Sequence, residues 1–201
     1  KDNNILIGTH IGLYSFDGSR FNAIEAVNSK KGKGDTPIYS IMEDSDKNIW
    51  LSTSRGVIKY SGNKATILNG ATGFIDQSVY STIEGKKNNY WFATENGIYN
   101  YDGKTFKNIN DTLGLSSNQV WLLQKDEKNN LWIGTNNGLD KMSLTEYYTT
   151  GRVVINHYGK EEGLKGLECN MNAGMHDAEG NLWFGTIKGV TVYNPHFDKI
   201  N

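Results

Sequence analysis

Asn89-Tyr90-Trp91-Phe92-Ala93-Thr94, followed by Gly97, is one copy of a short motif that recurs along almost the whole chain. The shared pattern is Asn-x-Trp-x-x-Thr, with Gly three residues after the Thr. Further copies occupy residues 48–56, 130–138 and 181–189, and a copy at 4–12 carries Leu6 in place of Trp. The motif Trp residues are spaced by 41, 41 and 51 residues, and Leu6 precedes the first of them by 44. One small unit is therefore repeated, which predicts a repeat fold.

A period of roughly 40 to 45 residues fits either a four-stranded propeller blade or a pair of helices. The residues between the motifs favour strands, because they form short runs rich in β-branched and aromatic side chains, bounded by Gly, Asn, Asp and Ser. The chain contains only 2 Pro and no long stretch of helical period. We therefore predict an all-β fold, a β-propeller of four-stranded blades of 41 to 51 residues.

Each complete repeat divides into four predicted strands. The predicted strands are 38–43, 48–53, 56–60 and 64–68; 79–84, 90–94, 97–101 and 105–109; and 120–125, 131–135, 138–142 and 153–158. The first repeat lacks the strand before its motif, and the last repeat stops after Tyr193-Asn194-Pro195. The sequence thus predicts 18 strands, roughly four and a half blades, whereas closed propellers have about four to eight whole blades.

Residues 1–201 are therefore predicted to form a single partial propeller, the C-terminal end of a longer one. The end faces of such a fan are expected to associate with a second copy, or the chain closes into an unusual small ring. We predict that the four motif Trp residues are core, because burying one ring removes ~150–250 Å² from water. The motif Thr is expected to satisfy a backbone group, and the Gly to permit the turn that follows.

Composition gives no sign of a charged partner. Lys and Arg total 21 against 22 acidic residues, the net charge is −1, and no one-sided block of charge occurs. Neither nucleic acid nor an anionic membrane surface is expected to bind. The chain has no run of about 18 apolar residues, so this segment is not expected to contact the membrane. Cys169 is the single cysteine, which excludes an intrachain disulfide.

The fourth repeat is similar to a known family. Residues 118–126, leading into 130–139, resemble the two-component regulator propeller repeat, Reg_prop, and Gly114-Leu115-Ser116-Ser117-Asn118 matches its usual beginning. The last repeat resembles the family's final blade through Gly163-Leu164, Glu168-Cys169-Asn170-Met171-Asn172 and Val192-Tyr193-Asn194-Pro195. In that family a small immunoglobulin-like domain commonly follows.

The resemblance implies a bacterial sensor region on the periplasmic or extracellular face of the cytoplasmic membrane. Such a region is expected to continue through a transmembrane helix into a histidine kinase, in some members a hybrid one, or into another signalling output of a two-component system. Family members of this architecture often detect oligosaccharides. Leu6 departs from the pattern, and no output domain lies within these residues, so the type of output is not assigned.

Motifs for chemistry are scarce. His10, His157, His176 and His196 lie far apart without ligand spacing, so no metal site and no cofactor are expected. Asp44, Asp46 and Asn48 mimic the start of a calcium loop, but Ile49 stands where that loop needs Gly and Arg55 where it needs an acid. A polar hairpin is the better interpretation. A pair of carboxylates for glycoside hydrolysis stays open, although no spacing favours it.

A ligand site is expected on one rim of the propeller. The loop before the first strand of each blade and the turn between its second and third strands lie on the same rim, and their residues differ between copies while the scaffold is repeated. Aromatic rings and amides there suit a sugar. The candidate ligand-binding residues are Tyr39, Arg55, Gln77, Tyr80, Glu95, Asn118, Gln119, Trp121, Asn136 and Asn170.

Alternatives stay open for these residues and for the function. Tyr39, Tyr80 and Trp121 stand at equivalent places and could simply pack the inner strands, while Arg55 and Glu95 could be solvated turn residues. The leading hypothesis is a non-catalytic sensor module. A second is a propeller enzyme, a lyase or glycosidase resembling the streptogramin lyases, and a third is a propeller for protein–protein interaction.

Overall fold

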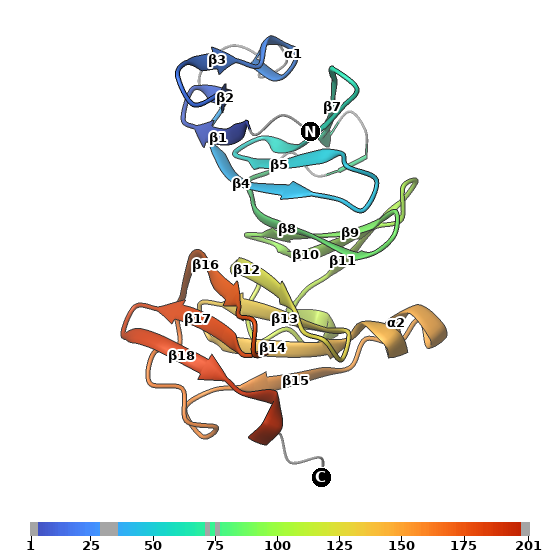
Figure 1. The fold of residues 1–201 in the computed structure, drawn as a ribbon. Helices are drawn as coiled ribbons and strands as arrows, with labels where there is room; N and C mark the ends of the chain where they lie inside the picture. Colours follow the sequence, from blue (N-terminus) through green and yellow to red (C-terminus); the bar gives the residue numbers. More distant parts are fainter. Residues whose placement is uncertain (1–3, 29–35, 71–72, 75–76, 198–201) are drawn as a thin grey trace.

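The computed structural model describes residues 4–28, 36–70, 73–74 and 77–197. They form five antiparallel sheets, the blades of a propeller, and within each blade strands consecutive in sequence pair with one another (Figure 1). Blade 1 is β1 (Ile5–Thr9), β2 (Gly12–Phe16) and β3 (Phe21–Ala23). Blade 2 is β4 (Ile38–Glu43), β5 (Ile49–Thr53), β6 (Gly56–Ser61) and β7 (Lys64–Leu68). Blade 3 is β8 (Val79–Lys86), β9 (Asn89–Thr94), β10 (Gly97–Tyr101) and β11 (Phe106–Ile109).

Blade 4 is β12 (Val120–Lys125), β13 (Asn130–Thr135), β14 (Gly138–Ser143) and β15 (Ile155–Tyr158), and blade 5 is β16 (Cys169–His176), β17 (Leu182–Thr186) and β18 (Gly189–Tyr193). The described residues thus hold the 18 predicted strands, and the all-β propeller prediction is confirmed. The first strands of neighbouring blades contact one another, which places them nearest the common centre. Apolar clusters fill the space between each pair of neighbouring blades among these residues.

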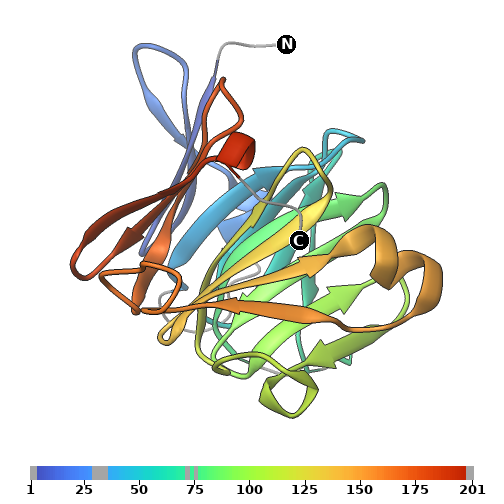
Figure 2. The same cartoon turned by 90° about the horizontal axis from the view of Figure 1, so that it is seen from below.

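Two short helices interrupt the pattern. α1 (Glu25–Asn28) follows β3, and α2 (Leu144–Thr150) lies at the outer end of blade 4, away from the inner strands (Figures 1 and 2). The sequence did not predict α2, and β15 accordingly begins at Ile155 rather than residue 153. Ser143 caps α2 by accepting a hydrogen bond from the Glu146 amide at 3.2 Å, and Gly151 ends it with a φ of 74°.

The motif Thr and Gly build the same turn in every blade. Each Thr hydroxyl donates to the carbonyl of the motif Gly over 2.8 to 3.1 Å and also accepts from a backbone amide within the turn. The motif Gly residues have φ between 92° and 134°, a region that side chains disfavour. Both predicted roles are confirmed.

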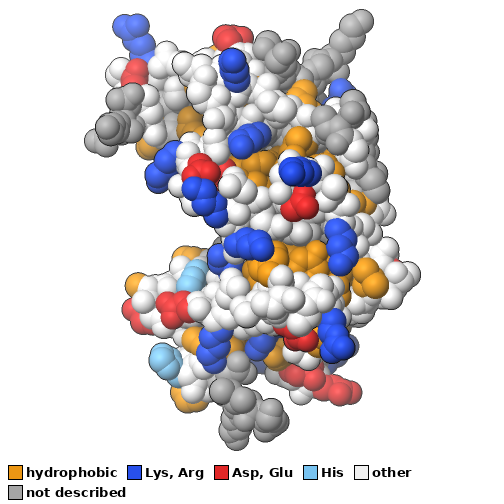
Figure 3. Space-filling model, turned by 90° about the vertical axis from the view of Figure 1, so that its right-hand side faces the viewer, with side chains coloured by type: hydrophobic (Ala, Val, Ile, Leu, Met, Phe, Trp, Pro, Cys, Tyr) orange, Lys and Arg blue, Asp and Glu red, His pale blue; other side chains and the backbone are white. Residues whose placement is uncertain are grey.

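Three of the motif Trp residues are core, as predicted. Trp50, Trp91 and Trp132 are exposed by 1, 0 and 1%. Each lies against the following blade: the Trp50 ring is 4.0 Å from Tyr90, and the Trp132 ring is 4.4 Å from Tyr193. At the outer edges Lys side chains border these rings, and Lys59 lies 5.2 Å from the Trp50 ring centre. Figure 3 shows Lys and Arg around the hydrophobic patches of this side.

The prediction for Trp183 was wrong, because its ring is 37% exposed. Phe184 packs toward Trp132 of blade 4, so Trp183, the preceding residue of β17, points to the opposite face of blade 5. Met175 and Val192 are paired with Trp183 across the sheet and are exposed by 54 and 43%, and Val190 beside them is exposed by 66%. This end face has no following blade among the described residues.

An Asp carboxylate accepts a hydrogen bond from the indole nitrogen of the motif Trp in three blades, and in two of them, at Asp44 and Asp126, it is buried. Trp50, Trp132 and Trp183 donate through Nε1 to Asp44, Asp126 and Asp177 over 2.8, 2.9 and 2.7 Å. Each Asp also accepts hydrogen bonds from the motif Asn in the same turn. The resulting hairpins are polar and hydrogen-bonded, as predicted for Asp44, Asp46 and Asn48.

Blade 3 replaces this carboxylate with a tyrosine from blade 4. Gly85 stands at the Asp position, and the Tyr148 hydroxyl of α2 accepts from Trp91 Nε1 at 2.8 Å and donates to Asn89 at 2.6 Å. A Cβ on Gly85 would meet both the Tyr148 hydroxyl and Trp91 Nε1. Gly85 and α2 therefore depend on each other, which explains why the excursion in the fourth repeat carries a helix.

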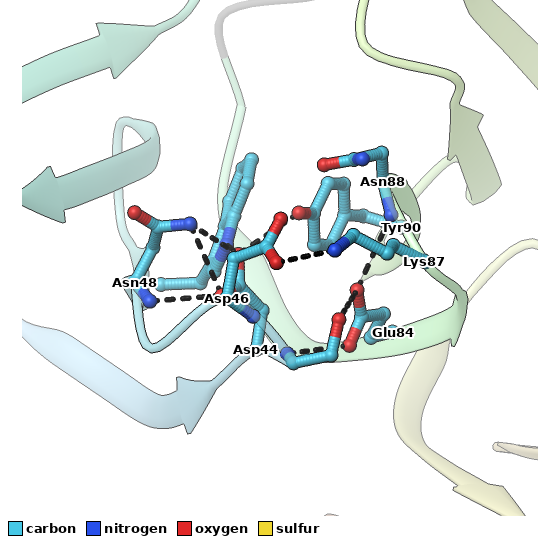
Figure 4. A network of polar contacts seen from close by, with 9 residues as sticks. Asp44, Asp46, Asn48, Glu84, Lys87, Asn88 and Tyr90 are labelled. Atoms are coloured by element: carbon cyan, nitrogen blue, oxygen red, sulfur yellow. Dashed lines mark hydrogen bonds and ion pairs between the residues drawn. The ribbon is translucent and has the colours of Figure 1, made fainter.

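Blades 2 and 3 are joined by polar contacts at the rim that holds these hairpins (Figure 4). The Glu84 carboxylate accepts from the Ser45 amide and hydroxyl at 2.8 and 2.9 Å, and Lys87 pairs with Asp46 at 2.6 Å. The Tyr90 hydroxyl donates to Asp44 at 2.9 Å. Burial acts to raise the pKa of Asp44, but hydrogen bonds from Trp50, Asn48 and Tyr90 outweigh it and lower the pKa to about 2.

Asp44 is expected to make the fold acid-sensitive. Because its folded-state pKa of about 2 lies below the ordinary 3.8, its stabilisation is complete above about pH 4 and is lost as the pH falls toward 2. We expect Asp44→Asn to lower the free energy of unfolding by up to ~2 kcal/mol at pH 7 and by less than half as much at pH 2.5. Urea unfolding at both pH values measures this. Asp46→Asn, an exposed control in the same turn, should change stability by less than ~1 kcal/mol.

In blade 3, Gly85 and the Tyr148 hydroxyl together take the place of the Asp acceptor. A double-mutant cycle tests whether these two residues depend on each other. Tyr148→Phe should cost ~1–3 kcal/mol, because it leaves Trp91 Nε1 without its acceptor. Gly85→Asp alone should also destabilise, since the new side chain meets the hydroxyl. Together they should destabilise less than the sum by ~1 kcal/mol, because the carboxylate replaces the lost acceptor. Additive losses in chemical denaturation would contradict this explanation.

We expect the end face around Trp183 to mediate self-association of the isolated chain. Trp183→Glu should then shift sedimentation velocity profiles toward the monomer, because it places a charge on the apolar face. Ile187→Glu is the matched control, since Ile187 is 59% exposed but lies in the turn between β17 and β18. Equal loss of association in both variants, or in neither, would count against this face.

Candidate functional site

Backbone hydrogen bonds join the two kinds of loop that were predicted to form the ligand-binding rim. The Ser54 amide donates to the Pro37 carbonyl at 3.2 Å, Asn136 to Gln119 at 3.2 Å, and Ile187 to Glu168 at 3.0 Å. Each bond links the turn between a blade's second and third strands to the segment that precedes its first strand. The predicted placement of these loops on one rim is therefore confirmed.

Three aromatic residues lie side by side on the first strands of blades 2, 3 and 4. Strand register shifts by one residue between Ile38 and Ser40, between Val79 and Ser81, and between Val120 and Leu122. The extra residues of these β-bulges are Tyr39, Tyr80 and Trp121, which we call the aromatic arc. Bulges re-aim the side chains they carry.

Rings of the aromatic arc contact one another in order. The Tyr39 and Tyr80 ring centres are 5.6 Å apart, and those of Tyr80 and Trp121 are 4.8 Å apart. All three residues are half-buried. Trp121 also packs on the cluster between blades 4 and 5, so packing of the inner strands, the alternative to ligand binding, describes part of its role. The structure thus brings Tyr39, Tyr80 and Trp121 together as one surface.

The Tyr80 phenol stays protonated over a wide pH range. Burial raises the pKa of Tyr80, the Glu95 carboxylate raises it further, and a hydrogen bond with Ser78 opposes them. Glu95 belongs to the turn of blade 3, so this coupling links the arc to the rim. A neutral phenol beside a carboxylate offers a hydroxyl and an acceptor, which are groups that bind sugar hydroxyls.

The remaining candidates divide by exposure. Arg55, Glu95, Gln119, Asn136 and Asn170 are exposed on the rim, whereas Gln77 is buried and Asn118 half-buried. Gln77 accepts from the Asn96 amide at 2.7 Å, and Gln119 accepts from Asn136 at 2.8 Å. Asn118 accepts from the Asp111 amide through its side chain and from the Gly97 amide through its carbonyl. Gln77 and Asn118 thus hold the loops, and the exposed residues are available to a ligand.

Sequence reasoning missed Asn172. This half-buried residue of β16 has a φ of 53°, and its side-chain amide donates to the carbonyls of Tyr39 at 3.0 Å and Tyr80 at 2.8 Å. Blade 5 therefore contacts two blades that are not its neighbours. The signal in the sequence was the longer distance between Cys169 and the Trp183 motif, which leaves room for a wider bulge.

Metal-binding residues do not gather in the part of the chain that the structure describes. No group of three or more His, Cys, Asp or Glu able to hold a metal occurs there. Cys169 is buried, which raises its thiol pKa to about 12, so the thiolate that reacts is scarce. None of the described helices is long and apolar enough to span a membrane.

Comparison with known proteins supports the repeat assignment. Residues 32–55 and 114–137 match the family described as two component regulator propeller. No curated protein sequence matches the chain.

Solved structures share the fold at low sequence identity. The extracellular domain of BT3049 from B. thetaiotaomicron, assigned to the hybrid two component systems, aligns with a TM-score of 0.77 and 22% identity over 97% of this chain and 27% of its own. The extracellular domain of BT4673 gives 0.73 and 22%, over 96% of this chain and 26% of its own. Virginiamycin B lyase from Staphylococcus aureus gives 0.65 and 13%, over 96% and 67%.

The chain spans about a quarter of the length of the two B. thetaiotaomicron domains. At these identities the structural likeness establishes the fold, and the family match rests on the repeats themselves. The five blades show that the chain is a β-propeller, and two of its segments, residues 32–55 and 114–137, match the two component regulator propeller family.

Proposed function

We propose that this chain is a non-catalytic, extracytoplasmic sensor module of a two-component system, which binds an oligosaccharide on its rim and signals to a linked histidine kinase. The observation that carries the proposal is the aromatic arc, three half-buried rings that lie together on the rim. The scaffold is the same in each blade while the rim differs. This is the pattern of a rigid frame that carries a recognition surface.

Chemistry of the rim favours a carbohydrate. Aromatic rings stack on the apolar face of a sugar, and amides and carboxylates bind its hydroxyls. The rim supplies exposed Gln119, Asn136 and Asn170 as amides, Glu95 as a carboxylate and Arg55 as a cation. Neutral sugars would use the amides, and Arg55 would add affinity for a sugar that carries a carboxylate.

The two-component assignment rests on the repeats matched at residues 32–55 and 114–137 and on the fold shared with extracellular domains of such systems. A propeller lyase is the second candidate, because the lyase from Staphylococcus aureus shares this fold. Fold alone does not separate sensing from catalysis. A ligand that binds without being consumed would favour sensing.

Thermal-shift measurements against a panel of neutral and acidic oligosaccharides test the proposal. A sugar at a hundred times its dissociation constant should raise the free energy of unfolding by about 2.7 kcal/mol. Chromatography of the sugar after incubation distinguishes binding from cleavage. If no sugar in the panel stabilises the folded protein, the carbohydrate proposal fails.

Tyr80→Leu should weaken binding of the sugar that gives the largest shift about tenfold, or ~1.4 kcal/mol, because it keeps apolar bulk but removes the ring. Tyr60→Leu is the matched control, since the Tyr60 hydroxyl donates to Asn63 at the opposite rim. Calorimetric titration of both variants gives the two dissociation constants. Equal weakening in both would show that general destabilisation, rather than the arc, is responsible.

A further inference from the structure

The contacts of Asn172 link blade 5 directly to the backbone that carries the aromatic arc. Its amide bridges the carbonyls of Tyr39 and Tyr80, residues 133 and 92 positions away in the sequence. Both acceptors belong to the extra residues of β-bulges, which have no partner in the strand register. A primary amide has two hydrogens, so one Asn side chain can serve both carbonyls at once.

A wide bulge in β16 places the Asn172 side chain against blades 2 and 3. In blades 2, 3 and 4 the bulge inserts one extra residue, whereas in β16 Cys169 pairs with Thr186 and the next pair is Gly174 with Phe184. Asn172 lies in this wider bulge with a φ of 53°, which Asn tolerates better than most residues. Beyond the bulge, a Cβ on Gly174 would meet the Gln124 side chain of β12, so β16 lies close against blade 4.

We propose that Asn172 is a positioning residue, which holds blade 5 against the bulges of blades 2 and 3 and thereby sets the geometry of the aromatic arc. The peptide planes that follow Tyr39 and Tyr80 are fixed by its two hydrogen bonds, and these planes orient the two side chains. The part of this proposal that concerns ligand binding by the aromatic arc rests on the proposed function. Its structural part, the link from blade 5 to blades 2 and 3, stands without any ligand.

The reciprocal consequence concerns signalling. A ligand that shifted the bulges of blades 2 and 3 would also move the two carbonyls that hold Asn172, and through Asn172 it would act on blade 5. Blade 5 also carries the exposed face around Trp183. Asn172 thus gives a physical route from the arc to that face through one side chain.

Asn172→Asp is the main test. Asp has nearly the same shape and tolerates the same backbone conformation, but a carboxylate cannot donate and would face two carbonyl oxygens. Spin labels at Lys64→Cys in β7 and Glu179→Cys before β17 report the distance between blades 2 and 5, while buried Cys169 stays unlabelled. We expect one narrow distance distribution in the parent protein and a broader or shifted one in Asn172→Asp. Near-ultraviolet circular dichroism should also lose part of the signal from the coupled Tyr80 and Trp121 rings.

Asn156→Asp is the matched control, because Asn156 is exposed on the outer strand β15 and receives the same change in charge. If Asn172→Asp does not fold, Asn172→Gly removes the amide without adding charge and permits the positive φ. Unchanged distances and an unchanged aromatic signal in a folded Asn172 variant would overturn the proposal. Since no sugar is added, this result is independent of the oligosaccharide panel.

Discussion

The burial of one large ring between neighbouring blades is the constraint on which this structure depends. A sheet of three or four short strands is apolar on both faces and cannot cover itself, so it requires a neighbour on each side. The motif Trp fills that space, and its Nε1 needs an acceptor because an unsatisfied buried donor costs ~1–3 kcal/mol. Asp44 and Asp126 supply the acceptor from the hairpin of the same blade, which fixes the turn and the ring together.

Local features of the sequence predicted the strands because they report local physics. Runs of β-branched and aromatic residues bounded by turn residues specify a hairpin wherever they occur, and the recurrence of the motif placed five hairpins correctly. The helix α2 was missed because its reason is tertiary: Tyr148 replaces a carboxylate that the third repeat lacks at Gly85. Trp183 was placed in the core by analogy with its copies, although burial depends on the neighbour that a blade has, rather than on the motif.

The position of the candidate site was predicted from the sequence, but the roles of its individual residues were predicted only in part. Repeated geometry assigned the loops to one rim, and equivalent positions gave Tyr39, Tyr80 and Trp121 as a group. Sequence could not separate Gln77 and Asn118, which hold loops, from exposed Gln119 and Asn136, because amides serve both purposes. For Asn172 the longer distance from Cys169 to the Trp183 motif indicated a wider bulge, but its partners could not be predicted, because they are backbone carbonyls.

A propeller is stiff within blades and adjustable between them, because hydrogen bonds hold each sheet while side-chain packing holds sheets together. Recognition by residues within one blade would leave that adjustable part unused. The aromatic arc instead takes one ring from each of three blades, so its shape depends on how those blades sit. Asn172 ties a further blade to the same backbone. Under the proposed function, a ligand on the arc would act on the relative positions of blades, the degree of freedom through which a sensor could transmit binding.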